Sequence, residues 1–482
     1  MKKIKTSTLV MLLLAAVLMA GCKKETESES NSNEGGDTPT STVGHVNPNP
    51  AQNTPLSENF LSEFQSVYQL YPNADGSFYA LAQGEHTDYL LHLDNNGYVQ
   101  QRIELGFRSR RCITKIGDYI VLLGNMGSVS SAPYGMYKQG YVAVYDRNMQ
   151  LVATLTLRED QYNTEIYSIV QDSNSPRVFY VGGFAVDDSY IQYPYLCTLQ
   201  FSEGLMTKVS SKIYSEYEKC RIVGLVEKQS AGQNDLILET IRYTVLDSPY
   251  NSNSSTVHIT KLNYFDEVSG WGNETWDVAI TGAHGDSYTG INSIDSDENN
   301  IYFFGYCNDD KEPAPSSGYW DSGLVAAVNW HQGQTVWTKT VSLTNKDERF
   351  YDGFLSGGYL YVCGSHSGLR YTTTKKDFGN GLVVKLSLTG ELVAYKTFGE
   401  PDRYSGLYHI AKDANGKLAC VGWSGENLGD DKIKYSGWFL KTEMLASTQK
   451  ALSDSNQDAR DNDLEVASTA APMEEGRHGG GM

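Results

Sequence analysis

Six long polar segments of this chain carry aromatic residues, and three of them also contain a pair of aspartates. An aromatic ring offers a flat apolar face, tyrosine and tryptophan add a polar edge, and a carboxylate accepts hydrogen bonds. Sugars present flat faces and hydroxyl groups, so the combination suits a carbohydrate ligand. The same rings could instead pack the loops against one another, and that alternative stays open for each residue. The predicted ligand-binding residues are Tyr134, Tyr137, Asp187, Tyr190, Tyr193, Tyr250, Asp309, Tyr319, Trp320, Tyr371, Trp423 and Tyr435.

Catalytic and metal chemistry find weaker support. Two separated carboxylates could hydrolyse a glycosidic bond, but 58 acidic residues leave no pair distinguished from the others. His86, His284 and His366 are scattered without the spacing of a zinc site. Residues 295–299 have a weak calcium-loop pattern, but they fall at an expected turn, where Asp and Asn are common. We therefore predict no catalytic residues, no metal site and no cofactor, and we favour a binding role over an enzymatic one.

A repeated strand pattern must position these segments. An apolar strand of about four residues, closed by a small residue, recurs seven times at intervals of 42 to 65 residues. Such regular recurrence is the mark of a repeat architecture. The closing residues are Ala82, Gly124, Gly182, Thr240, Gly305, Gly364 and Gly422.

Each repeat contains the pattern of four successive strands. Tight turns join the first strand to the second and the third to the fourth, as at residues 73–76 and 94–97. The long polar segments join the second strand to the third, which places them all on one face. Four short antiparallel strands repeated around an axis form a β-propeller. The sequence therefore predicts an all-β, seven-bladed propeller of four-stranded antiparallel blades over residues 58–447.

Closure of the ring is the uncertain part of this fold. The seventh repeat lacks a fourth strand, and residues 55–61 could supply it from the N-terminal side, although their pattern is poor. A sheet sandwich or another blade count is the alternative.

Residues 390–399 resemble the PQQ-like and related propeller repeats of bacterial envelope proteins. This resemblance implies architecture rather than activity. Quinoprotein dehydrogenases share such repeats, but they carry a tryptophan in nearly every blade and an adjacent cysteine pair. Here Trp337 and Trp276 alone take the tryptophan position, and the cysteine pair is missing.

The first 21 residues have the features of a secretory signal. Lys2, Lys3 and Lys5 precede an apolar run over residues 9–20, which is too short to span a bilayer. Residues 18–22 resemble the lipobox of bacterial lipoproteins, which implies cleavage before Cys22 and its acylation, palmitate included. Residues 23–29 resemble the surface-export signal of Bacteroidetes lipoproteins. Together they imply a Gram-negative outer-membrane lipoprotein exposed on the cell surface; the periplasmic leaflet is the alternative.

Composition limits the remaining possibilities. A net charge of −19 argues against binding to nucleic acid or to anionic lipid headgroups. Residues 22–57 and 448–482 are polar and contain few apolar side chains, so we expect a disordered tether and a disordered tail. Cys307, Cys363 and Cys420 fall at equivalent positions of different blades, which are too far apart for disulfides. We expect most of the cysteines after Cys22 to be small buried hydrophobes, with a redox role as the alternative.

These observations favour a lipid-anchored envelope protein whose propeller loops recognise an extracellular ligand, in particular a glycan. The outer membrane, through the lipid anchor, and a glycan or an envelope protein are the predicted partners. Two alternatives stay open. One is a scaffold that resembles the propeller lipoprotein of the outer-membrane protein assembly machine, and the other is a hydrolase acting on polysaccharide.

Overall fold

A computed structural model describes most of the region predicted as the propeller. The described residues are 41–43, 54–127, 139–189, 191–230, 233–243, 255–262, 274–280, 293–309, 320–341, 343, 347–367, 379–400, 403–428 and 433–445. Every regular element in these ranges is a β-strand. A search of the same residues finds no helix that has the length and apolar character to span a membrane.

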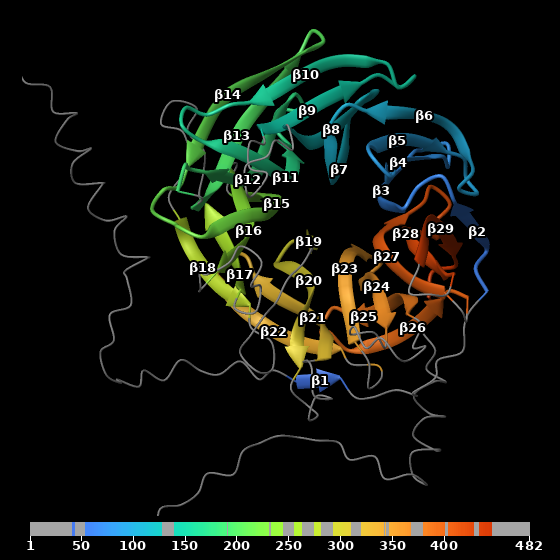
Figure 1. Ribbon diagram of the computed structural model, residues 1–482. Helices are drawn as coiled ribbons and strands as arrows, with labels where there is room; N and C mark the ends of the chain where they lie inside the picture. Colours follow the sequence, from blue (N-terminus) through green and yellow to red (C-terminus); the bar gives the residue numbers. More distant parts are fainter. Residues whose placement is uncertain are drawn as a thin grey trace, which may run out of the picture. The chain divides into compact units, whose positions relative to one another are not determined.

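All strands but one form seven four-stranded antiparallel sheets arranged as the blades of a ring (Figure 1), which confirms the predicted fold class. Blade 1 consists of β3 (Ser66–Pro72), β4 (Phe78–Gln83), β5 (Asp88–Leu93) and β6 (Val99–Leu105). Blade 2 consists of β7 (Arg108–Ile116), β8 (Tyr119–Met126), β9 (Gln139–Tyr145) and β10 (Leu151–Leu157). Blade 3 consists of β11 (Asn163–Gln171), β12 (Val178–Val186), β13 (Gln192–Ser202) and β14 (Leu205–Ile213). Blade 4 consists of β15 (Cys220–Ser230), β16 (Gln233–Tyr243), β17 (Ser255–Leu262) and β18 (Glu274–Ile280).

The second half of the ring continues the same order. Blade 5 consists of β19 (Ser293–Ser296), β20 (Asn300–Asp309), β21 (Trp320–Asn329) and β22 (Gln334–Val341). Blade 6 consists of β23 (Asp347–Ser356), β24 (Tyr359–Ser367), β25 (Asn380–Ser387) and β26 (Leu392–Phe398). Blade 7 takes β27 (Arg403–Lys412), β28 (Leu418–Asn427) and β29 (Ile433–Thr442) from the C-terminal side.

The N-terminal side supplies the fourth strand of blade 7. β2 (Ser57–Leu61) pairs antiparallel with β29, so the first and last parts of the ring share one sheet. The indole Nε1–H of Trp438 donates to Glu58 Oε1 at 2.8 Å, and the Trp438 ring stacks on Phe60 at 6.3 Å. A further strand, β1 (Ser41–Val43), pairs in parallel with the outer strand β22 of blade 5. β1 lies inside the range 22–57 predicted as a tether.

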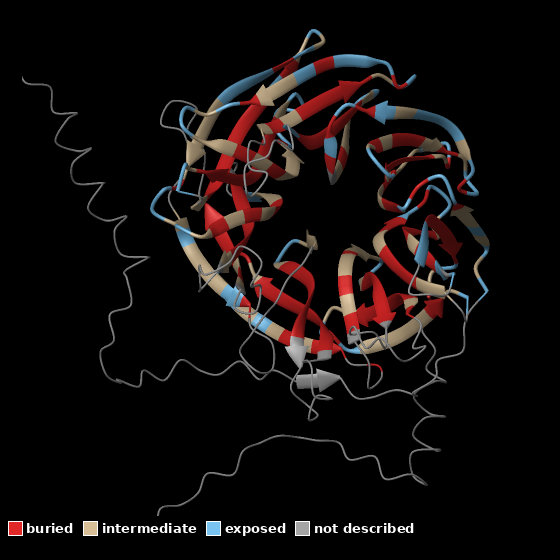
Figure 2. Cartoon of the chain, in the orientation of Figure 1, coloured by how far each residue is buried: buried red, intermediate tan, exposed pale blue. Residues whose placement is uncertain are grey.

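The core lies between the blades, because each twisted sheet buries both faces against its neighbours. Between blades 7 and 1, for example, Val67 and Phe78 pack with Val421 and Phe439. The middle strands are therefore almost wholly buried, whereas the outermost strands β6, β10 and β14 expose many side chains (Figure 2). The six cysteines of the described ranges are all free, and all but Cys112 are buried.

The innermost strand of six blades contains a β-bulge, an extra residue that bends the strand and increases its twist. In each case the residue before the bulge pairs with a small residue or a threonine of the second strand. The bulged residues are Tyr68, Arg110 with Arg111, Tyr167, Val223, Tyr351 and Tyr408. The residues of the second strand that pair before the bulge are Ala82, Gly124, Gly183, Thr240, Gly364 and Gly422.

These positions explain the small residue that closes the repeated strand pattern. A Cβ added to Gly364 would lie 1.8 Å from the carbonyl oxygen of Arg349, and one on Gly422 would lie 1.8 Å from that of Gly406. In blade 3 the close approach falls one residue later than the sequence pattern indicates, at Gly183 rather than Gly182. Because glycine has no side chain, the backbone of the bulged first strand can lie directly against it.

We expect Gly364→Ala to lower the free energy of unfolding by at least about 2 kcal/mol, because the new methyl group forces the β23 backbone to move. Chemical denaturation of the purified protein measures this change. Gly106→Ala is the matched control, since nothing lies within 4 Å of its added Cβ. Equal stability of the two variants would contradict the proposed role of the close approach.

Removal of β2 should weaken the closed ring. A chain that starts at residue 62 leaves β29 as an open edge and deprives Trp438 of both Phe60 and Glu58. We expect its Tm to fall by roughly 5 °C or more relative to a chain that starts at residue 54. Scanning calorimetry compares the two chains, which differ by β2 and its flanking residues. Indistinguishable melting curves would show that β2 does not stabilise the ring.

Candidate functional site

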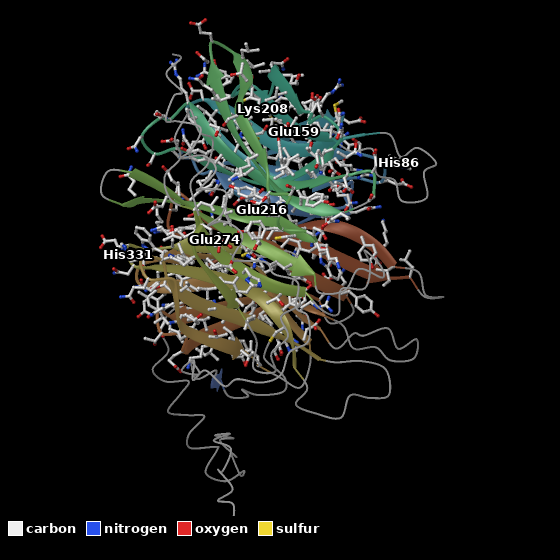
Figure 3. All side chains as sticks on the ribbon, turned by 90° about the vertical axis from the view of Figure 1, so that its left-hand side faces the viewer. His86, Glu159, Lys208, Glu216, Glu274 and His331 are labelled. Carbon is white, nitrogen blue, oxygen red and sulfur yellow. The ribbon has the colours of Figure 1, made fainter. Side chains whose placement is uncertain are left out.

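The innermost strands enclose a central cavity of about 770 Å³. Its lining residues come from β3, β7, β11, β15, β19, β23 and β27, one strand from each blade. Gln83, Asp88 and Asn125 also line it, and they lie where second and third strands meet their connecting loops. The cavity is therefore nearer to the face of the second–third loops. Figure 3 shows the two faces through His86 of the β4–β5 loop and His331 of the β21–β22 turn, which lie on opposite sides of the ring.

Tyrosine rings form a continuous arc along one wall of this cavity. Tyr351 and Tyr408 meet edge to face with 5.4 Å between ring centroids, and Tyr408 is 6.0 Å from Tyr68. Tyr306 of β20 extends the arc behind Tyr351 at 6.4 Å. The three rings that line the cavity are all bulge residues and are only half-buried. The bulges of blades 6, 7 and 1 thus place three aromatic side chains side by side at the centre of the ring.

The residue after the bulge connects its blade to the next one. Asp352 Oδ2 accepts a hydrogen bond from the backbone N–H of Ile410 at 2.9 Å. In the same way, Gln69 Oε1 accepts from Ile113 at 2.9 Å, and His409 Nδ1 accepts from Leu70 at 3.4 Å. These bonds hold the inner strands of blades 6, 7, 1 and 2 together. The tyrosines between them therefore stand on a rigid frame.

A histidine and an aspartate are paired at the base of the arc. His409 Nε2 lies 3.5 Å from Asp352 Oδ2, while its Nδ1 accepts from the backbone. A neutral imidazole that accepts at Nδ1 carries its proton on Nε2, so we assign the Nε2–H toward Asp352. Asp295 of blade 5 accepts from the N–H of Leu355 at 2.7 Å. Burial, with a smaller contribution from Asp352, raises the pKa of Asp295 despite this bond.

Two arginines, Arg108 and Arg221, line other parts of the wall. The buried Asp88 carboxylate accepts from Arg108 Nη1 at 3.1 Å and from both the backbone and the hydroxyl of Ser109 at 2.7 and 3.1 Å. In blades 3 and 4, the Arg221 guanidinium lies 5.8 Å from the ring centroid of Tyr167. Both cavity carboxylates, Asp88 and Asp352, are thus already held by hydrogen bonds. The geometry suits the binding of a polar ligand better than acid–base catalysis by a carboxylate pair.

The predicted residues of blade 3 have a local role. Asp187 Oδ1 accepts from the N–H groups of Ser189 and Ile191, both at 2.9 Å, and its Oδ2 accepts from the Tyr193 hydroxyl at 3.0 Å. Burial, followed by the Asp187 carboxylate, raises the pKa of Tyr193 to about 12. Asp187 therefore shapes the β12–β13 turn, and Tyr193 packs against Tyr162.

The predicted residues of blade 7 also form a pair. Trp423 on β28 and Tyr435 on β29 meet edge to face at 5.7 Å. Tyr435 is exposed, whereas Trp423 lies against Gly406, where an added Cβ would come within 2.9 Å of its Nε1. Neither these two residues nor Asp187 and Tyr193 line the central cavity.

The other predicted residues cannot be placed relative to the cavity. For Asp309 and Trp320 the structure describes the backbone alone, which pairs them at the ends of β20 and β21. Seven lie outside the described residues: Cys22, Tyr134, Tyr137, Tyr190, Tyr250, Tyr319 and Tyr371.

Sequence reasoning missed the tyrosines of the first strands. Their signal is a three-residue pattern, an apolar residue followed by tyrosine and then a polar residue. It occurs as Val67-Tyr68-Gln69, Ile166-Tyr167-Ser168, Phe350-Tyr351-Asp352 and Leu407-Tyr408-His409. A search of the described residues for three or more His, Cys, Asp or Glu side chains that could hold a metal ion finds none.

Comparisons with known proteins assign neither a family nor a function to this chain. No protein-family model matches the chain, and no curated protein matches it. Among solved structures, Drosophila Plexin A in complex with Semaphorin 1b is 8% identical with a TM-score of 0.43, covering 82% of this chain and 88% of its own. A protein of unknown function from Bacteroides caccae is 10% identical with a TM-score of 0.37, covering 66% and 92%. The phage phi92 endosialidase is 8% identical with a TM-score of 0.42, covering 83% and 69%. A likeness at such identities does not extend to ligands or activity.

Cys112 should be unreactive although it lines the cavity. The residue is partly exposed, but the surrounding protein desolvates the thiol and raises its pKa to about 12, against a smaller opposing effect of the Ile169 N–H. At pH 8 very little of the thiol is then ionised, and the thiolate is the nucleophile. We expect negligible alkylation of Cys112 by iodoacetamide at pH 8, measured by peptide mass spectrometry, and ready alkylation after unfolding in guanidinium. Rapid labelling of the folded protein would contradict this environment.

Proposed function

We propose that this protein is a lipid-anchored envelope protein whose propeller binds a glycan in its central cavity. The observation that carries the proposal is the arc of Tyr351, Tyr408 and Tyr68. These rings offer apolar faces and hydroxyl groups in a cavity whose volume falls in the range of small-ligand sites. The polar side chains of Gln69 and Gln83 line the same space. Their Oε1 atoms accept from the Ile113 N–H and the Tyr68 hydroxyl, and their amide NH₂ groups are donors suited to the hydroxyl groups of a sugar.

The proposed address rests on the N-terminal sequence. The apolar run followed by residues 18–22 supports acylation of Cys22, and residues 23–29 support display on the outer surface of a Gram-negative outer membrane. The repeats resemble those of PQQ-like envelope propellers, which supports the same compartment. A protein held by a lipid on one residue would keep its cavity available to ligands outside the cell.

Neither alternative function gains a specific observation. A polysaccharide hydrolase would need a carboxyl group free to exchange protons. The described cavity carboxylates Asp88 and Asp352 instead bind neighbouring backbone and side-chain groups. A scaffold would use exposed edges or loops rather than a cavity at the centre of the ring.

The double variant Tyr351→Ala, Tyr408→Ala tests the proposal. We expect a loss of affinity of at least about tenfold for the oligosaccharides that the native protein retains, because stacked rings supply much of the contact area. Retention on an array of polysaccharides identifies the ligand, and isothermal titration calorimetry then measures the affinity.

Tyr98→Ala is the matched control. Tyr98 is 57% exposed in the β5–β6 turn, on the face away from the loops, and its replacement should leave affinity unchanged. Far-UV circular dichroism verifies that both variants fold. Absence of binding to any glycan by the native protein, or equal affinity of the double variant, would overturn the proposal.

A further inference from the structure

The cavity wall formed by blades 2 to 4 is cationic, in contrast to the tyrosine arc of blades 6, 7 and 1. Arg108 of β7 and Arg221 of β15 both line the cavity. Blade 4, which carries Arg221, lies across the ring from blade 7, whereas blade 2, which carries Arg108, is next to blade 1 (Figure 1). A ligand that fills the cavity therefore meets aromatic rings along blades 6, 7 and 1 and guanidinium groups from blades 2 and 4.

The cations are more accessible than the anions. The Arg108 side chain is 50% exposed, whereas its partner Asp88 is 3% exposed and Asp352 is 13% exposed. Arg108 thus extends beyond the carboxylate that it pairs with. Arg221 is half-buried and lies over Tyr167, an arrangement that keeps a guanidinium next to an aromatic face. A ligand in the cavity would contact guanidinium groups before carboxylates.

The charge of the whole chain makes these two arginines informative. A chain with a net charge of −19 repels anions at long range, yet Arg108 and Arg221 both line the central cavity.

We propose that the cavity binds an acidic saccharide, one that carries a carboxylate or a sulfate group. This inference rests on the proposed function and names the class of glycan. The sugar ring lies against Tyr351, Tyr408 and Tyr68, and the acidic group is bound by Arg221, with Arg108 of blade 2 as the second guanidinium group that lines the cavity. Guanidinium groups match both carboxylate and sulfate because each presents paired oxygens to two parallel N–H donors.

Calorimetry with three oligosaccharides of equal length tests the inference: one carboxylated, one sulfated and one neutral. We expect the native protein to bind at least one acidic probe about tenfold or more tightly than the neutral one, with an affinity that falls as NaCl is raised. The difference between the carboxylated and sulfated probes identifies the acidic group.

Arg221→Gln should remove most of this preference. We expect at least about tenfold weaker binding of the acidic probe and less than about twofold change for a neutral one. Arg147→Gln is the matched control, since Arg147 is exposed in the β9–β10 turn on the other face. Circular dichroism verifies folding, and the NaCl dependence of the native protein tests the inference independently of either variant.

The possible failures are distinguishable. Binding of the neutral probe with equal or greater affinity than the acidic probes overturns the acidic class and leaves the proposed glycan site intact. Unchanged affinity of folded Arg221→Gln for the acidic probe overturns the assignment of the arginine side. Absence of binding to every glycan tested overturns the proposed function together with this inference.

Discussion

The centre of this ring is shaped by one recurring contact. The backbone of a bulged inner strand lies directly against a glycine or another small residue of the second strand. Gly364 and Gly422 have no room for a Cβ because carbonyl oxygens of the first strand lie against them. A regular strand would point its side chains alternately toward the two adjacent blades. The extra residue of each bulge interrupts that alternation and aims Tyr351 or Tyr408 at the ring axis instead.

The same irregularity connects the scaffold to the cavity. The residue after the bulge, such as Asp352 or Gln69, accepts a backbone N–H of the following blade, while the bulged residue lines the central space. Two adjacent positions of one strand therefore have different roles. The bulged residue lines the cavity, and the residue after it stabilises the contact between blades. Side chains held on strands by such bonds are better defined in position than side chains on loops. The arginine side, with Asp88 fixed by Arg108 and Ser109, follows the same principle.

The regular repeat allows the fold to be predicted from the sequence. The site lies at β-bulges, which the repeat pattern does not show. Seven strands closed by small residues identify the blades, and residues 55–61 were already a candidate for the closing strand. The tyrosine arc was missed because a tyrosine within an apolar strand is expected to be core, and a bulge breaks the period that would show otherwise. In addition, Tyr68 and Tyr408 are far apart in the chain, and ring closure alone brings them within 6.0 Å. The loop pair Asp187 and Tyr193 was conspicuous in sequence but satisfies its own turn.

Closure by β2 also sets the order of events during biosynthesis. Glu58 and Trp438 are separated by 380 residues, so the strand made first waits for a partner made almost last. At ribosomal rates of about 5–20 residues per second, that interval is roughly 20 to 80 seconds. During this time Phe60 and the edge of blade 1 have no native cover. Apolar residues of the opening strands therefore stay uncovered until the last blade has been made and has folded.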